Sequence, residues 1–134
     1  MSGEKELSLL LASMCPSLDD KDYVFTTVSD VNALMQSGIQ PKAMFVENEG
    51  TTLVLTVADA QLVQLPFTGK YRCITLNVHS SLEAVGLTAA VATALAKVNI
   101  SANVIAAYYH DHIFVPEAKA SQALDTLLAL THNK

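Results

Sequence analysis

The chain has 134 residues, enough for one typical domain or for two half-sized units that share a core. It is 51% hydrophobic and only 16% charged, so we expect a second copy or another partner to cover part of its apolar surface. The formal net charge is −5 and the eight Lys and Arg residues are scattered, which argues against nucleic acid as a partner.

The chain opens with a predicted helix and a predicted strand. Apolar residues at helical spacing indicate an amphipathic helix over 4–14 that packs on a sheet and ends before Pro16. The polar stretch 17–22 is typical of a turn, and the β-branched and aromatic run 23–28 is typical of a strand.

A short helix and a hairpin should follow. Asp30 or Ser29 is suited to cap the helix, and Gly38 is suited to end it. The residues Asn48-Glu49-Gly50 have the chemistry of a tight turn between two strands. The predicted strands and a further helical turn lie at 43–47, 51–57 and 58–63.

The second half predicts better-defined elements. One face of the strand predicted over 71–79 is mostly aliphatic, and an apolar stripe over 87–98 indicates a helix. Both alternating sets of residues in 101–109 are largely apolar, so a strand there should be covered on both faces, with Tyr108 and Tyr109 on opposite faces. A turn at 110–111, a strand at 113–115 and a closing helix from Pro116 to about Thr131 complete the chain.

The same order of elements occurs twice. Strand, helix, strand, strand, helix runs from 71 to 131, and a shorter copy runs from 23 to 63. We therefore expect two domains, 1–68 and 69–134, with a boundary at Pro66-Phe67-Thr68-Gly69. The helix over 4–14 would fill the space left by the short helices of the first copy.

The sequence favours a cytoplasmic protein. No run approaches the roughly 18 apolar residues of a membrane helix, and Met1–Glu6 is acidic where a signal peptide is basic. Cys15 and Cys73 show no metal or redox spacing and are typical of small buried residues in a reducing compartment.

The segment Val85–Ser101, with the sequence VGLTAAVATALAKVNIS, resembles the signature of ACT domains. In that signature Gly-Leu opens the first helix, an alanine-rich helix follows, and isoleucine with a polar residue begins the second strand. Continued through Asn103, 108–112 and 114–116, the sequence is similar to small bacterial proteins with tandem aspartate-kinase-like ACT domains. The resemblance implies an α+β, ferredoxin-like fold of tandem βαββα units, whose antiparallel sheet carries helices on one face.

The resemblance also implies a ligand site, with an amino acid as the small-molecule ligand at an interface between paired ACT units. The site would lie where the first strand of the second copy passes into the first helix, facing the partner's second strand. Helix N–H groups would attract a carboxylate there, Gly86 would permit close approach, and Glu83 could meet an ammonium group. The implied residues are His79, Ser80, Ser81, Glu83, Val85, Gly86 and Leu87, with Ser101 and Asn103 on the second strand.

Two differences from the ACT pattern count against this ligand site. Many ACT domains have proline where this chain has Val85, and many amino-acid-binding members have asparagine where it has Ser101. Asn103 is two residues further on and would share a strand face with Ser101.

Structural explanations compete with each functional one. Ser80 and Glu83 fit a capping box, Gly86 fits a packing glycine, and Asn103 could be satisfied by backbone partners. His110 and His112 invite a metal or acid–base hypothesis, but the sequence has neither a fourth metal ligand nor a nucleophile motif beside them.

Two functions remain open. The first is a regulatory amino-acid-binding module that acts through a homodimer, a higher homo-oligomer or another partner. The second is a structural dimerisation or interaction protein whose ligand cleft is vestigial. Neither interpretation requires a catalytic residue, a metal, a cofactor or a membrane.

Overall fold

The computed structural model describes residues 3–78 and 86–132, and these residues form two compact units. Unit 1 combines the chain up to Asp20 with the chain from Arg72 onward, and unit 2 is Lys21–Tyr71. Unit 2 is therefore inserted in the sequence between the two parts of unit 1. The predicted domain boundary near residue 68 lies close to the end of this insertion and stays a prediction.

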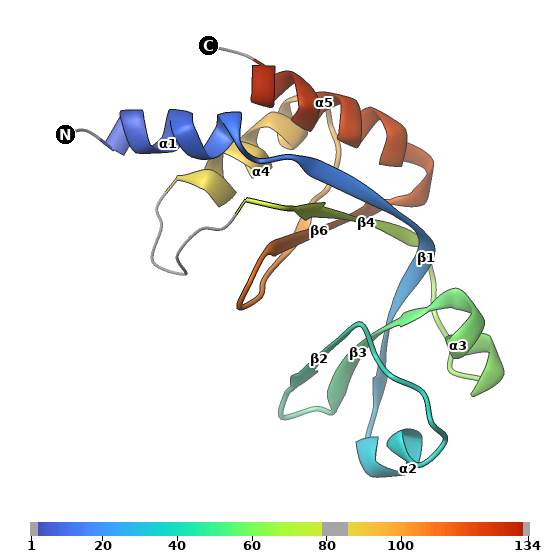
Figure 1. Ribbon diagram of the computed structural model, residues 1–134. Helices are drawn as coiled ribbons and strands as arrows, with labels where there is room; N and C mark the ends of the chain where they lie inside the picture. The colour runs from blue at the N-terminus through green and yellow to red at the C-terminus, as the bar shows by residue number, and fades with distance from the viewer. Residues whose placement is uncertain (1–2, 79–85, 133–134) are drawn as a thin grey trace. The chain divides into compact units, whose positions relative to one another are not determined.

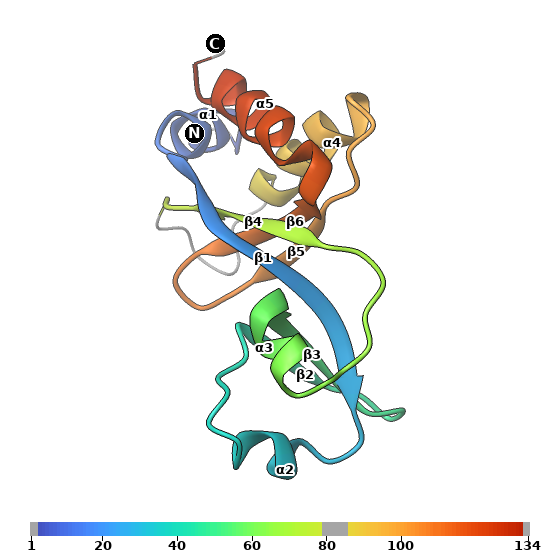
Figure 2. The same cartoon turned by 90° about the vertical axis from the view of Figure 1, so that its right-hand side faces the viewer.

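Unit 1 places helices on one face of an antiparallel sheet, as Figures 1 and 2 show. The strand order is β1-β4-β6-β5, where only the first residues of β1 belong to this unit. Its elements are α1 (Gly3–Ala12), β1 (Pro16–Val28), β4 (Tyr71–Leu76), α4 (Leu87–Lys97), β5 (Asn103–Ala106), β6 (Asp111–Pro116), the 3-10 turn Glu117–Lys119 and α5 (Ala120–His132).

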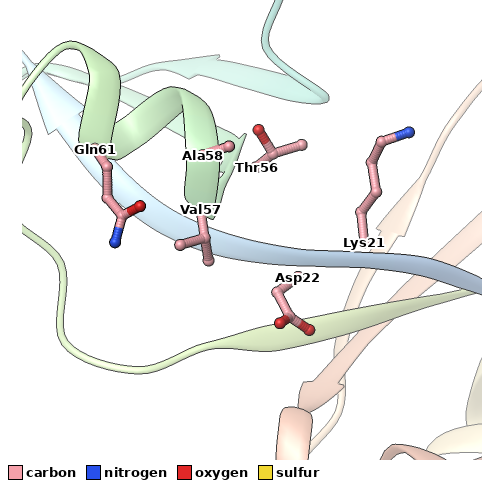
Figure 3. A pocket seen from close by; sticks show the side chains of 6 residues that line it. All are labelled: Lys21, Asp22, Thr56, Val57, Ala58 and Gln61. Carbon is pink, nitrogen blue, oxygen red and sulfur yellow. The ribbon is translucent and has the colours of Figure 1, made fainter.

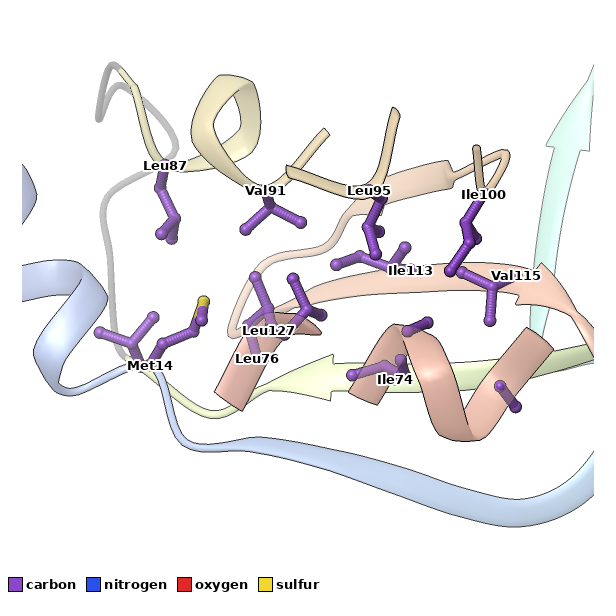
Figure 4. Packing of buried hydrophobic residues seen from close by; sticks show 13 residues of the cluster. Met14, Ile74, Leu76, Leu87, Val91, Leu95, Ile100, Ile113, Val115 and Leu127 are labelled. Carbon is purple, nitrogen blue, oxygen red and sulfur yellow. The ribbon is translucent and has the colours of Figure 1, made fainter. Parts of the chain in front are cut away.

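The core of unit 1 lies between this sheet and its helices (Figure 4). The helix α4 buries Leu87, Val91 and Leu95, which recur every four residues and so share one face. They pack with strand residues such as Ile74 and Ile113, both fully buried. The predicted apolar stripe of α4 is confirmed as the side that faces the core.

The leading helix α1 packs in unit 1. It contacts α4 and α5, and its Leu7, Leu10 and Leu11 pack against the core cluster of that unit. The expectation that this helix fills space in the first copy is therefore wrong. The longer helices of the second copy present apolar side chains that the amphipathic face of α1 can cover.

Unit 2 repeats the element order in smaller form. It contains the rest of β1, then α2 (Val31–Met35), β2 (Ala43–Val46), β3 (Thr51–Thr56) and α3 (Val57–Leu62). Its strands have the order β1-β3-β2 and are antiparallel, with Phe25 opposite Val54 and Phe45 opposite Thr52. The predicted hairpin is confirmed, since the Glu47 N–H donates to the Gly50 carbonyl at 3.0 Å. Its buried core residues are Val24, Leu34, Ile39, Leu53, Leu55 and Ala60.

Two expectations about strands were wrong. The stretch 17–22 is not a turn, because β1 already begins at Pro16. There the Asp19 carbonyl accepts hydrogen bonds from Arg72 Nε at 3.0 Å and from its terminal nitrogen at 2.6 Å. Tertiary pairing of this kind overrides the local preference of polar residues for turns.

The strand predicted over 101–109 is shorter than expected. β5 ends at Ala106, and the Ala107 N–H donates to the His110 carbonyl at 3.1 Å, so the chain turns before His110–Asp111. Tyr108 and Tyr109 are 76% and 65% exposed and stack edge to face with centroids 5.0 Å apart. They lie in the turn and not on the two faces of the sheet, whereas Val104 and Ile105 are half-buried.

Asp30 caps α2 as predicted, and its removal should cost stability. Its Oδ1 accepts hydrogen bonds from the N–H groups of Asn32 and Ala33 at 3.0 and 3.4 Å. We expect Asp30→Ala to lower the free energy of unfolding by about 1 kcal/mol in urea denaturation, because two helix donors lose their acceptor. Asp30→Asn keeps an acceptor and should stay within a few tenths of the parent; an equal loss in both variants would contradict a capping role.

In the part of the chain that the structure describes, none of the helices is long and apolar enough to cross a membrane.

Candidate functional site

The site implied by the sequence is centred on the connection from β4 to α4. Five of its nine residues, namely His79, Ser80, Ser81, Glu83 and Val85, lie outside the described residues. The structure places the other four, Gly86, Leu87, Ser101 and Asn103, all in unit 1.

Gly86 is the N-cap of α4 and has φ of 105°, a conformation that favours glycine. Its carbonyl accepts a hydrogen bond from the Ala90 N–H at 2.8 Å, and it supplies no side-chain cap. A Cβ at this position would lie 3.5 Å from Leu7 Cδ2. The backbone conformation at the start of α4 therefore favours glycine at this position, and a side chain there would contact Leu7 of α1.

The remaining described residues of the implied site differ in exposure. Leu87 is 2% exposed and packs in the core of unit 1, whereas Asn103 at the start of β5 and Ser101 just before the strand are exposed. The Asn103 Nδ2 donates to the Phe114 carbonyl on the adjacent β6 at 3.3 Å. The side-chain amide nitrogen of Asn103 therefore already has a backbone partner.

Asn77 fixes the end of β4 from which the chain leaves toward the implied site. Its Nδ2 donates to the Cys15 carbonyl at 2.8 Å and to Ser17 Oγ at 3.0 Å, and its N–H donates to the Met14 carbonyl at 2.9 Å. These bonds join β4 to the junction of α1 and β1. The sequence contained no signal for this anchor, because its partners lie some 60 residues away.

His110 and His112 do not form a metal-binding site with other described residues. His112 Nδ1 lies 2.9 Å from Thr75 Oγ1, and His110 lies in the turn between β5 and β6. Among the residues that the structure describes, no group of three or more His, Cys, Asp and Glu side chains could hold a metal ion.

Sequence reasoning missed a hollow of about 370 Å³ in unit 2 (Figure 3). Lys21 and Asp22 line this hollow from β1, where they project to opposite sides of the strand. Gln61 and Val57 line it from α3. Thr56 Oγ1 caps α3 by accepting from the Asp59 N–H at 3.1 Å. The residues that line the hollow carry a cation, a carboxylate, a hydroxyl and an amide, a set suited to a small polar molecule.

A larger hollow of about 610 Å³ lies on the helical side of unit 1 and includes Gly86. Its lining is mostly alanine and other apolar residues of α4 and α5, with Leu7 of α1. Lys97, Thr93 and Thr126 supply polar groups. The hollow therefore runs along α4 from Gly86 to the end of the helix.

Comparison with known proteins identifies the family. Two models described as ACT domain match the chain, one over residues 2–72 and the other over residues 68–129. A Vibrio cholerae protein of unknown function, described as a possible transport protein, is 54% identical with a TM-score of 0.87, and the match covers 97% of this chain and 99% of that one. No curated protein matches.

More distant structures share the fold. The regulatory subunit of aspartate kinase from Thermus flavus has 11% identity and a TM-score of 0.64, over 86% of this chain and 95% of that one. A structure of aspartokinase α and β subunits has 11% identity and a TM-score of 0.63, over 89% and 97% of the two chains. The two matched models and the repeated element order agree: this chain belongs to the ACT domain family and carries two ACT domains in tandem.

Proposed function

We propose that this protein is a regulatory, non-catalytic module that binds a small amino-acid-like ligand at the junction of β4 and α4. The proposed ligand residues are those implied by the sequence, and the response to the ligand is a change in association with a second copy or another protein. Membership of the ACT family and the fold shared with aspartate kinase regulatory subunits support this proposal.

The observation that carries the proposal is the start of α4. Gly86 caps this 11-residue helix without a side-chain bond, so its cap supplies no acceptor to the first N–H groups. Such N–H groups, together with the helix dipole, attract carboxylates. Asn103 at the start of β5 and Ser101, two residues before it, are exposed and would contact the rest of the ligand or a ligand held by a paired unit.

A thermal-shift screen with the twenty amino acids at millimolar concentration tests the proposal. A ligand at one hundred times its dissociation constant should stabilise the protein by roughly 2.7 kcal/mol, so one or a few amino acids should raise the melting temperature selectively. Asn103→Ala should reduce that shift, whereas Asn32→Ala, an exposed change on α2, should leave it unchanged. A flat screen, repeated with related metabolites, would count against ligand binding.

Substitution of Gly86 is a poor test of the same site. Its φ of 105° and its contact with Leu7 mean that a bulky side chain would disturb the start of α4 and the packing of α1. A lost ligand response in such a variant would then report misfolding. The exposed Asn103 avoids this ambiguity.

One observation favours the second function, a dimerisation protein with a vestigial cleft. The bond from Asn103 Nδ2 to the Phe114 carbonyl satisfies part of the side chain within the sheet. Under this alternative, self-association would proceed normally while no small molecule changed either the melting temperature or the extent of association.

A further inference from the structure

The connection from β4 to α4 is held at both of its described ends by one stretch of chain near the N-terminus. Before the connection, Asn77 bonds to Met14–Ser17, and after it Gly86 lies beside Leu7 of α1. We call residues 7–17 the N-terminal segment. All of these residues belong to unit 1. The proposed ligand residues lie on the same connection, so the N-terminal segment contacts the chain on either side of them.

Asn77 holds the junction between α1 and β1 in a defined shape. Its Nδ2 donates to the Cys15 carbonyl at 2.8 Å and to Ser17 Oγ at 3.0 Å, and its N–H donates to the Met14 carbonyl. Cys15 has φ of 47°, a left-handed conformation that residues other than glycine keep only where surrounding contacts hold them. Met14 is fully buried in the core cluster of unit 1 (Figure 4). The direction of α1 is therefore tied to the end of β4.

Leu7 places α1 against the start of α4. A Cβ at Gly86 would lie 3.5 Å from Leu7 Cδ2, and both residues line the hollow of about 610 Å³ on the helical side of unit 1. The Gly86 carbonyl accepts a bond from the Ala90 N–H, which begins the hydrogen-bonded part of α4. On the same helix, Leu9 is 64% exposed. α1 therefore touches α4 where the connection enters it, through one side of the helix.

We propose that α1 positions the ligand site, so that ligand binding and the packing of α1 on α4 favour each other. Leu7 and Asn77 are the positioning residues. A site that is held in shape in advance loses less conformational freedom when it binds, so affinity should depend on α1. Coupling between two events is reciprocal, so the ligand should also hold α1 more tightly. The inference rests on the proposed function for its ligand, whereas the contact between α1 and α4 is tested without one.

Amide hydrogen exchange by NMR tests the contact in the protein without ligand. Leu7→Ala should speed exchange of the Ala90 amide by about fivefold or more, because the start of α4 loses the side chain beside it. The Ile100 amide, whose bond to the Leu95 carbonyl ends α4, should keep its rate. The matched control Leu9→Ala should change neither rate.

Two outcomes of this experiment would overturn the proposal. Equal acceleration at Ala90 and Ile100 would show that Leu7 adds only to the general stability of unit 1. An unchanged rate at Ala90 would show that Leu7 does not hold the start of α4. Circular dichroism checks that each variant keeps its helices.

Calorimetric titration tests the effect on binding, with the amino acid that gives the largest shift in the thermal-shift screen. Leu7→Ala should weaken its affinity by about fivefold or more. Leu7→Met keeps an apolar side chain of similar size and should stay within about twofold of the parent, as should Leu9→Ala. Equal affinities for Leu7→Ala and the parent would overturn the proposal, because a purely structural contact need not affect binding.

Asn77→Ala is a second variant that leaves the contact at Gly86 in place. It removes the bonds to the Cys15 carbonyl and to Ser17 Oγ but keeps the backbone bond to Met14. It should weaken affinity in the same direction as Leu7→Ala. The double variant should lose less than the sum of the two single losses in binding free energy, because both act by releasing α1. Additive losses would show that the two contacts act separately and would contradict positioning by α1.

The reciprocal effect is measured on α1 itself. At about one hundred times its dissociation constant, the selected amino acid should slow exchange of the Ser13 amide, which bonds to the Leu9 carbonyl at the end of α1. The Gln36 amide, which bonds to the Asn32 carbonyl in unit 2, is the control and should be unaffected. Slower exchange at Ala90 without slower exchange at Ser13 would overturn the proposal.

The ligand screen and the exchange experiment fail independently. A flat screen, together with faster Ala90 exchange in Leu7→Ala, would remove the proposed function and leave α1 as the element that positions the start of α4. A selective thermal shift with unchanged Ala90 exchange in that variant would do the reverse.

Discussion

Leu95→Ala should destabilise the protein by about 2–5 kcal/mol, because it removes a buried side chain and leaves a cavity. Leu95 is fully buried in the core cluster of unit 1, on the face of α4 that also carries Val91. Its backbone also helps to end the helix, since the Leu95 carbonyl accepts from the Ile100 N–H at 3.0 Å. The truncation leaves that bond in place, so the loss should come from packing.

Urea denaturation followed by circular dichroism measures the effect as a fall in the transition midpoint. The matched control is Leu9→Ala in the same unit, where the leucine is 64% exposed and the change should stay within about 0.5 kcal/mol. Equal losses in the two variants would mean that Leu95 is not a core residue. A broad transition in Leu95→Ala alone would indicate that the unit no longer unfolds cooperatively.

The sequence predicted the elements whose signal is local. The apolar stripe of α4 needs only the 3.6-residue period, and the Asn48-Glu49-Gly50 turn needs only its own residues and two flanking strands. Both are found where they were expected. The tandem order of strands and helices was predictable for the same reason, because it is a series of such local signals.

The errors arose where hydrogen bonds decide the structure, one of them between distant residues and the other within a turn. The first residues of β1 are polar and look like a turn, yet Arg72 binds the Asp19 carbonyl from 53 residues away. Tyr108 and Tyr109 look like strand residues, yet a bond from Ala107 to His110 places them in a turn. Neither contact leaves a trace in a local pattern of hydrophobicity.

The candidate functional residues were also only partly predictable from the sequence. Gly86 was singled out by the resemblance to the ACT signature, in which Gly-Leu opens the first helix, and the structure places it at the start of α4. The hollow beside Thr56 could not be predicted in this way, since Lys21 and Asp22 are more than thirty positions away from Gln61 in the sequence. Family resemblance pointed to the first location and carried no information about the second.

The two units present different edges although they repeat one element order. Asn103 on β5 donates a hydrogen bond to β6, and Val104 and Ile105 are half-buried. On β2, Met44, Phe45 and Val46 are all exposed. Part of the exposed apolar surface expected from composition therefore lies on β2 in the smaller unit, while the predicted ligand residues belong to the larger one.

Gly50→Ala should destabilise unit 2 by about 1–3 kcal/mol, because the added Cβ has no space and the backbone is strained. Gly50 has φ of 155°, and a Cβ there would lie 2.8 Å from Thr27 Oγ1 and 3.1 Å from the Val28 carbonyl oxygen. Gly50 also closes the hairpin that holds β2 against β3. Thermal unfolding monitored by circular dichroism measures the loss.

The double variant Thr27→Ala with Gly50→Ala separates the two causes. Removal of the Thr27 hydroxyl relieves the 2.8 Å contact but leaves both the Val28 contact and the positive φ, so the double variant should recover only part of the stability. Full recovery would mean that the side-chain clash alone disfavours alanine, and no loss in Gly50→Ala would contradict the close packing of this turn.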